Sequence, residues 1–151
     1  EVSAAMGLTS LESLSEFVET NRKNYFAYCK GLQGVPGIQL IEYDKNETNN
    51  YQYVVLEIDE NKSGINRDNI LRLLHAENVL ARRYFFPGCH RMEPYRSFFP
   101  NAGSILPETE RLTSKLLQLP TGTAVGEKEI EKICDFIRFI IAHQAELRKK
   151  V

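Results

Sequence analysis

The sequence contains 151 residues with a mass of 17.3 kDa, a length that suits one folded domain. Hydrophobic residues make up 42% and charged residues 26%, proportions typical of a globular protein. The formal net charge of −1 provides no positive field that would draw the chain to nucleic acid or to an anionic membrane, and no apolar run approaches the roughly 20 residues that span a bilayer.

The cysteines and the first residues indicate the expected compartment of the chain and whether it is part of a longer protein. Cys29, Cys89 and Cys134 are an odd number without paired spacing, which argues against a disulfide framework or a zinc ribbon. We therefore expect no metal site and a reducing, cytoplasmic compartment. The sequence opens at Glu1 with a helix-like stretch that has neither an initiator methionine nor a signal peptide, so we expect a piece of a longer protein.

The first third of the chain predicts a long helix followed by a hairpin. Apolar side chains in residues 1–32 recur close to the 3.6-residue helical period, and the glycines and proline of 31–37 end the pattern. Its first residues are small and allow another backbone to approach, so we expect this end to pack against a further part of the protein. Segments 38–43 and 51–59 are rich in β-forming residues, and the polar stretch 44–50 between them predicts a loop.

The remainder alternates helices with short strands. Asn66 can cap a helix, because an asparagine side chain accepts hydrogen bonds from the free amide groups of a first turn. Residues 86–106 hold three prolines and two glycines and predict irregular chain, with one turn of helix near 94–98. The further elements that we expect are helices at 67–77, 107–117 and 127–150 and strands at 81–85 and 117–119.

This order of elements predicts an α+β fold. We expect a small, mainly antiparallel sheet with helices packed on one face, preceded by the long helix. Residues 1–32 would then be a connecting element, and residues 33–151 would form the domain with its own core.

The densest group of chemically active side chains lies in residues 81–96, which hold four arginines, one histidine and four aromatic residues. Arginine presents a fixed fork of donors that matches phosphate, and aromatic rings offer flat faces to a sugar or a base. This composition suits an anionic, ring-containing ligand, but a solvated basic loop on a small aromatic core explains it equally well. The neighbours Cys89 and His90 would point to opposite sides of an extended chain, which argues against a nucleophile–base pair.

Four segments in order resemble the C-terminal part of one enzyme family. Residues 1–12 are similar to its "E-x-x-A-A-x-G-L-x-x-L-E" helix, and residues 50–55 to the strand that opens its small-domain sheet. Residues 83–95 are similar to its arginine–aromatic–histidine segment, and residues 119–130 to its closing "L-P…E-I" signature. The family is that of the DegT/StrS-type sugar aminotransferases, which are pyridoxal-phosphate enzymes of the aspartate-aminotransferase fold.

The resemblance implies a reaction and a set of contacts. Such enzymes transfer an amino group from glutamate or a similar donor to a keto sugar that is attached to a nucleotide. The resemblance implies that Arg83, Tyr84 and His90 contact the nucleotide sugar, with Arg82 and Tyr95 as weaker candidates. It also implies that the Schiff-base lysine and the pyridoxal phosphate belong to a large domain outside these residues, so we expect no catalytic and no cofactor-binding residue here.

Two interpretations remain open. In the first, residues 1–32 are an interdomain helix and residues 33–151 the small domain of a nucleotide-sugar aminotransferase. This fragment would be inactive alone, would contribute only substrate contacts and would require the missing large domain. In the second, the chain is a free-standing α+β module that binds an anion or mediates assembly without catalysis. In both we expect no nucleic-acid or membrane partner. If the chain is a fragment, the apolar face of its first helix is exposed, and we expect a homo-oligomer that associates through residues 1–32.

Overall fold

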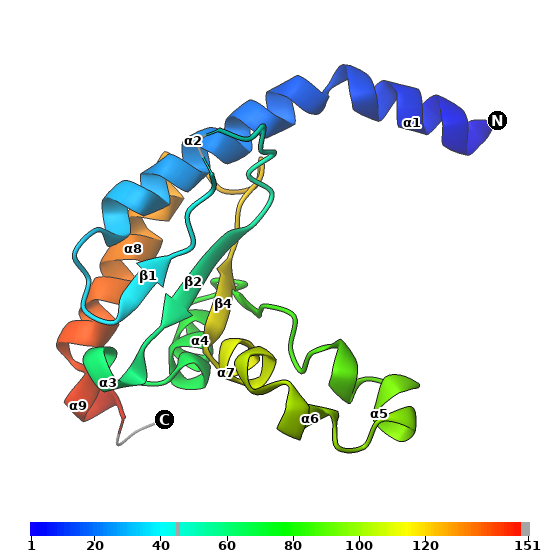
Figure 1. Ribbon diagram of the computed structural model, residues 1–151. Coiled ribbons are helices and arrows are strands. Elements are labelled where there is room, and N and C mark those ends of the chain that lie inside the picture. The colour runs from blue at the N-terminus through cyan, green and yellow to red at the C-terminus, as the bar shows by residue number, and fades with distance from the viewer. Residues whose placement is uncertain (45, 149–151) are drawn as a thin grey trace.

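The computed structural model describes residues 1–44 and 46–148. The strands β1 (Ile38–Leu40), β2 (Val54–Ile58), β3 (Arg82–Arg83) and β4 (Leu116–Leu119) form one antiparallel sheet in the order β1-β2-β4-β3 (Figure 1). The helical elements are α1 (Val2–Glu12), α2 (Leu14–Leu32), α3 (Glu60–Ser63), α4 (Arg67–Ala76), the 3-10 turn η1 (Cys89–Arg91), α5 (Tyr95–Phe98), α6 (Ala102–Ile105), α7 (Pro107–Lys115), α8 (Glu127–Ala142) and α9 (Gln144–Leu147). Within these ranges no helix has both the length and the apolar character that crossing a membrane requires.

The hydrophobic core lies between one face of the sheet and the helices α2, α4 and α8. Val54, Leu56 and Leu117 are fully buried and belong to one cluster with the inward side chains of those helices. Because successive residues of a strand point to opposite faces, the paired residues Val55 and Gln118 point to the other face. The predicted α+β fold, with helices packed on one face of a small antiparallel sheet, is confirmed.

The predicted single helix over residues 1–32 is wrong. The helix is interrupted at Ser13, which ends α1 and precedes α2. The hydroxyl groups of Thr9 and Ser10 donate to the carbonyl oxygens of Ala5 and Met6 at 3.1 and 2.9 Å. Such bonds to the preceding turn draw carbonyl groups away from the backbone ladder and bend helices, which accounts for the break one turn later.

Other boundaries are shorter than the sequence predicts. Strands expected over 51–59 and 81–85 contract to β2 and β3. The helix expected over 127–150 is divided into α8, which ends at Ala142, and the short helix α9. His143 leaves the helical conformation there, and Lys149 and Lys150 lie outside the described residues. The predicted cap of α4 is confirmed, because the Asn66 side chain accepts a hydrogen bond from the backbone of Asn69 at 2.9 Å.

A close approach of α2 and α8 holds the helical layer together. A Cβ atom placed on Gly31 of α2 would lie 2.5 Å from the Sγ atom of Cys134 on α8, so only glycine allows this packing. Arg138 of α8 donates to the carbonyl oxygens of Gly31 and Gln33 at 2.8 and 3.2 Å. Asn24 of α2 donates to the carbonyl oxygens of Gly122 and Val125 and thereby fixes the loop that leads from β4 into α8.

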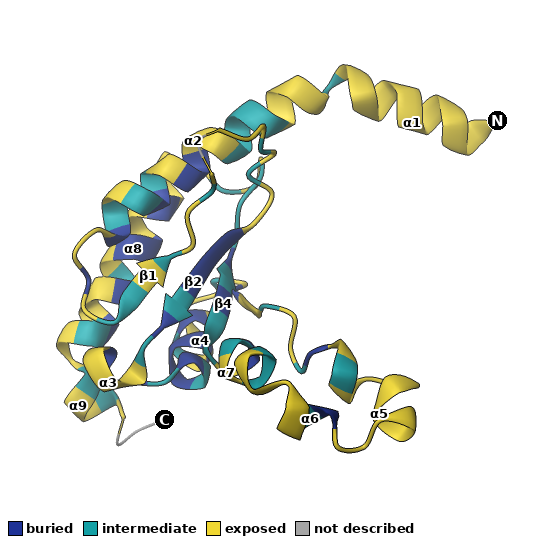
Figure 2. Ribbon diagram, viewed as in Figure 1, coloured by how far each residue is buried: buried dark blue, intermediate teal, exposed yellow. Residues whose placement is uncertain are grey.

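Two segments extend away from this body. Residues 1–19, here called the N-terminal arm, contain α1, all of whose residues are exposed (Figure 2). Residues 82–106, here called the excursion, start on β3 and carry η1, α5 and α6 before the chain returns in α7. In the view of Figure 1, α1 and the α5–α6 segment both leave the body on the right.

The approach of α2 and α8 predicts that the same substitution has different effects at two glycines. We expect Gly31→Ala to lower the free energy of unfolding by about 1–3 kcal/mol, since the added methyl group overpacks against Cys134. Gly7→Ala on α1 is the matched control, because nothing lies within 4 Å of the added atom. Urea unfolding measures both, and an equal effect at the two positions would contradict the packing role of Gly31.

Candidate functional site

Strand β3 directs the two adjacent arginines to different faces of the sheet. Arg82 pairs with Gln118 and Arg83 pairs with Leu117. Leu117 points into the core, so Arg83 starts from the helix-covered face and Arg82 from the opposite face. Both side chains are exposed, but they leave the strand on opposite faces and therefore do not form one paired binding site for a phosphate group.

Arg83 is held by a carboxylate and an aromatic ring. Its Nε atom donates to Oδ1 of Asp68 on α4 at 2.9 Å, and its guanidinium carbon lies 4.8 Å from the centre of the Phe86 ring. Burial opposes the ionisation of Asp68, but hydrogen bonds from Arg83 and Arg67 outweigh it and hold the pKa of the Asp68 carboxyl below its ordinary value. The carboxylate therefore stays charged and offsets part of the local positive charge.

Arg67 anchors this group from the interior. Its residue surface is only 3% exposed, and its Nε atom donates to the same Asp68 oxygen at 2.6 Å. Its Nη1 atom donates to the carbonyl oxygens of Thr113 and Leu116 at 3.0 and 2.9 Å. A buried charge persists only when such partners replace water, so we infer that Arg67 is a fixed structural cation.

Tyr84 belongs to an aromatic group on the face from which Arg82 starts. Its ring meets Tyr53 edge-on at 5.6 Å and Phe85 at 4.5 Å, and burial raises the pKa of its phenol. Tyr43 supports Tyr53 by donating its hydroxyl to the Tyr53 carbonyl oxygen at 2.8 Å. Tyr43 and Tyr53 were not predicted as site residues. Tyr53 could have been predicted by continuing the two-residue alternation of β2 back to it.

His90 lies in a second group, between η1 and α7. Its Nε2 atom is 2.7 Å from Oε1 of Glu110, and its side chain is only 7% exposed. Arg91 donates its Nε atom to the same oxygen at 2.6 Å. Hydrogen bonds from Arg91 first and His90 second lower the pKa of Glu110 to about 2. Gly88 completes the packing, because a Cβ atom there would lie 2.8 Å from the His90 ring.

Tyr95 lies apart from both of these groups. It lies on α5 and is 53% exposed, and in the described part of the chain no hydrogen bond or ring contact joins it to Arg82, Tyr84 or His90. The structure thus brings Arg82 and Tyr84 to one side of the sheet and separates them from Arg83, His90 and Tyr95. A polar pocket of about 390 Å³ lies beside His90, with Arg91 and Arg96 on its wall, and could accept an anionic group.

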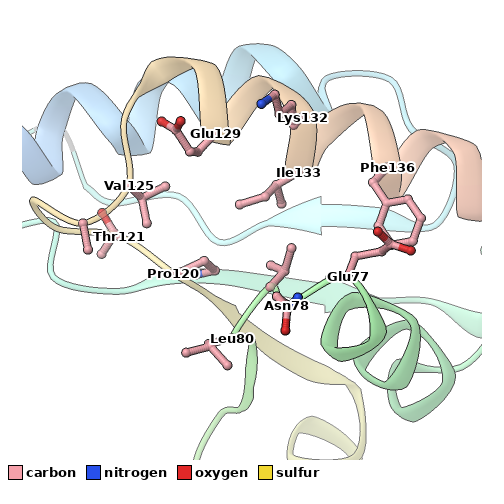
Figure 3. A pocket seen from close by; sticks show the side chains of 12 residues that line it. Glu77, Asn78, Leu80, Pro120, Thr121, Val125, Glu129, Lys132, Ile133 and Phe136 are labelled. Carbon is pink, nitrogen blue, oxygen red and sulfur yellow. The ribbon is translucent and has the colours of Figure 1, made fainter.

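An apolar pocket lies on the helix-covered side of the sheet. It has a volume of about 570 Å³ and lies between α8, the end of α4 and the loop after β4 (Figure 3). Ile133 and Phe136 of α8, Leu80 and Pro120 contribute its apolar wall. The five predicted site residues are absent from its lining, so this pocket and the arginine-rich segment are separate features.

The exposure of the described lysines bears on where a pyridoxal cofactor could attach. A lysine that forms a Schiff base is activated in a desolvated pocket. Lys115 is half-buried, and the other described lysines are exposed. Within the described ranges there is also no group of three or more histidine, cysteine, aspartate or glutamate side chains placed to hold a metal ion.

Comparison with known proteins identifies the family. A model of the DegT/DnrJ/EryC1/StrS aminotransferase family matches residues 1–138. The chain belongs to this family. This match confirms the predicted family assignment. The proteins that match the chain are sugar aminotransferases.

Individual family members match at very different identities. The dTDP-4-amino-4,6-dideoxy-D-glucose transaminase of Escherichia coli is 31% identical over 133 residues, which is 88% of this chain and 36% of that protein. The crystal structure of DesI in the presence of its TDP-sugar product superposes with a TM-score of 0.88 at 46% identity, over 97% of this chain and 37% of DesI. Helicobacter pylori PseC, at 14% identity and a TM-score of 0.79 over 91% of this chain and 36% of its own, shares the fold. The chain thus spans slightly more than a third of the length of these relatives.

The depressed pKa of Glu110 predicts that acid loosens the excursion. A carboxyl with a lowered folded-state pKa stabilises the structure above its unfolded pKa near 4.5, and that contribution is lost as the pH falls towards 2. We expect limited proteolysis within residues 88–106 to accelerate over this interval. Glu110→Gln should show fast cleavage already at pH 7 and little further change with acid. Glu108→Gln on the same helix is the matched control, and identical pH profiles for the two variants would rule out the Glu110 tether.

Proposed function

We propose that this chain acts as the small domain and connecting helical segment of a pyridoxal-phosphate-dependent aminotransferase that transfers an amino group to a nucleotide-linked keto sugar. In this proposal residues 33–151 form the small domain and residues 1–32 connect it to a large domain that holds the cofactor. The parent enzyme would be a homo-oligomer in the cytoplasm, and the segment alone would not catalyse.

The similarity to DesI is the observation that carries this proposal. DesI is 46% identical across 97% of the chain, and its crystal structure was determined in the presence of its TDP-sugar product. The E. coli relative is also named for a dTDP-sugar, so two matches support a deoxysugar nucleotide as the substrate class. The chain covers only 36–37% of each relative, which supports the inference that a large domain is missing. That domain would supply the Schiff-base lysine.

The role of this chain would be to bind and orient the substrate. Arg82 is exposed and its side chain has no hydrogen-bonded partner among the described residues, so its guanidinium fork is available to a diphosphate oxygen. Tyr84, supported by Tyr53, would offer a ring and a hydroxyl beside it. Arg83 would contribute through the donors that Asp68 does not occupy, and Tyr95 from the exposed side of α5.

His90 would act mainly by fixing η1 against α7, because its ring is enclosed and bonded to Glu110. Pyridoxal phosphate, when bound in the parent enzyme, supplies the electron sink for amino transfer. The residues of this chain contribute charge, shape and exclusion of water around the sugar nucleotide.

A chimera tests the substrate role of Arg82. We expect DesI in which this chain replaces the matching region to bind the TDP-sugar product, and Arg82→Ala in that chimera to raise Kd roughly 10- to 100-fold, as loss of a charge-assisted hydrogen bond implies. Calorimetric titration measures the affinity, and circular dichroism verifies the fold.

Arg111→Ala is the matched control for this experiment. Arg111 is an exposed arginine of α7 that pairs with Glu57 and Glu108, and its loss should leave the affinity unchanged. Equal Kd values for the Arg82 variant, the Arg111 variant and the parent chimera would contradict the proposed contact. A folded chimera without affinity for the sugar nucleotide would contradict the proposed function as a whole.

The proposal also predicts that the 151 residues alone do not form a specific cofactor adduct. After incubation with pyridoxal phosphate and reduction with borohydride, we expect only scattered, substoichiometric modification of exposed lysines. Peptide mass spectrometry measures the distribution. Stoichiometric reduction onto one lysine would instead show a cofactor site within this chain.

A further inference from the structure

The face of the sheet opposite the core carries a small cluster of its own. Val55 of β2 points to this face, yet its residue surface is only 7% exposed. Tyr53, which precedes β2, and Tyr84, which follows β3, belong to the same face, and their rings meet edge-on at 5.6 Å. Side chains of the chain itself therefore cover Val55.

The register of the sheet shows how the two tyrosines reach each other. Arg82 pairs with Gln118 and Gln118 pairs with Val55, so the three residues form one row across the strands. β2 and β3 both run antiparallel to β4 and are therefore parallel to each other. Tyr53 lies two residues before this row and Tyr84 two residues after it, a separation of about 13 Å along the strands. The rings can meet only if both side chains incline over the row, which explains the burial of Val55.

Tyr43 holds the backbone of Tyr53 at two points. Its hydroxyl donates to the Tyr53 carbonyl oxygen at 2.8 Å and accepts from the Tyr53 amide at 3.3 Å. The amide of Tyr43 in turn donates to the hydroxyl of Tyr25 on α2 at 3.4 Å, and the rings of Tyr43 and Tyr25 meet at 5.1 Å. Tyr25 is only 4% exposed, so these contacts connect the backbone of Tyr53 to the helical layer.

The chain next to Tyr53 has a backbone conformation that needs support. Tyr51 has a φ of 51°, in the left-handed region that residues with a side chain rarely adopt. Such a conformation persists only when its surroundings hold it. The ring of Tyr51 lies 5.0 Å from that of Tyr43 and 5.3 Å from that of Tyr25. Tyr43 thus fixes both the strained residue and the backbone that follows it.

We propose that Tyr43 is a positioning residue of the substrate site. By fixing the backbone of Tyr53 it holds the Tyr53 ring in the place where Tyr84 packs, and so sets the position of the Tyr84 ring and hydroxyl. This inference rests on the proposed function, in which Arg82 and Tyr84 meet the nucleotide sugar. Because the ring of Tyr84 is ordered before the ligand arrives, less of the binding free energy is lost in ordering it.

Tyr28→Phe is the matched control for a purely structural role of Tyr43. The Tyr28 hydroxyl is also bonded to a backbone carbonyl oxygen, that of Pro120 at 2.9 Å, but Tyr28 belongs to the core on the other face of the sheet. Tyr43→Phe and Tyr28→Phe each remove one hydroxyl and its hydrogen bonds, so both should lower the midpoint of urea unfolding. Only the first should disturb Tyr84.

Nuclear magnetic resonance of this chain without ligand tests the positioning step. We expect Tyr43→Phe to weaken the nuclear Overhauser effects between the rings of Tyr53 and Tyr84. Burial raises the pKa of the Tyr84 phenol, so we also expect this pKa to fall towards its ordinary value as the ring becomes exposed. Tyr28→Phe should change neither quantity. Unchanged ring contacts in folded Tyr43→Phe would overturn the proposal, whatever the chain binds.

Affinity measurements in the DesI chimera test the consequence for substrate. We expect Tyr43→Phe to raise Kd for the TDP-sugar product roughly three- to tenfold, the range that loss of a neutral hydrogen bond implies, and Tyr28→Phe to leave it unchanged. In a Tyr84→Leu background, Tyr43→Phe should have no further effect, because it acts through Tyr84.

The outcomes separate this proposal from the proposed function. Equal effects of Tyr43→Phe and Tyr28→Phe on Kd, or an undiminished effect of Tyr43→Phe in the Tyr84→Leu background, would overturn the positioning role while the chimera still binds its ligand. A folded chimera that binds no sugar nucleotide would contradict the proposed function, and with it any role of Tyr43 in substrate binding.

Discussion

The buried guanidinium of Arg67 is the interaction on which the placement of the arginine-rich segment depends. It binds Asp68 and the carbonyl oxygens of Thr113 and Leu116, and through Asp68 it also holds Arg83. These contacts join α4 to the start of the excursion and to the α7–β4 junction beyond its end. Since a buried cation without partners costs several kcal/mol, the surrounding carbonyl groups and carboxylate are constrained together. Arg67 therefore connects the start of the excursion, and the α7–β4 junction that follows it, to α4.

This attachment explains why the candidate site is divided. Arg83 and His90, the residues expected to meet substrate, are each bonded to a carboxylate of the same chain, Asp68 and Glu110. Arg82 and Tyr84 belong to the other face of the sheet and have more freedom to meet a ligand. We regard the carboxylate-bound residues as the support that sets the shape of the segment, and Arg82 with Tyr84 as the groups that would bind charge. Under the proposed function, that ligand would be the nucleotide sugar.

The features that could be predicted from the sequence are those with local causes. The Asn66 cap, the positions of the strands and the start of the helix at residue 127 depend on neighbouring residues and were predicted correctly, although several element ends were not. The break at Ser13 was missed because hydroxyl bonds of Thr9 and Ser10 compete with a helical pattern that is otherwise continuous. The partners of Arg83 and His90 were missed for a different reason. Asp68 and Glu110 lie 15 and 20 residues away, and only tertiary packing brings them close.

Hydrogen exchange of an Arg67→Met variant tests most directly whether this cation holds the excursion on the core. Methionine keeps much of the length and apolar contact of the side chain but removes its charge and its three bonds. We expect amide protection in residues 82–86 and 113–116 to fall about tenfold more than in residues 130–140 of α8, because opening becomes local to the excursion and its return. An equal fall everywhere, or unchanged protection in residues 82–86, would contradict the account.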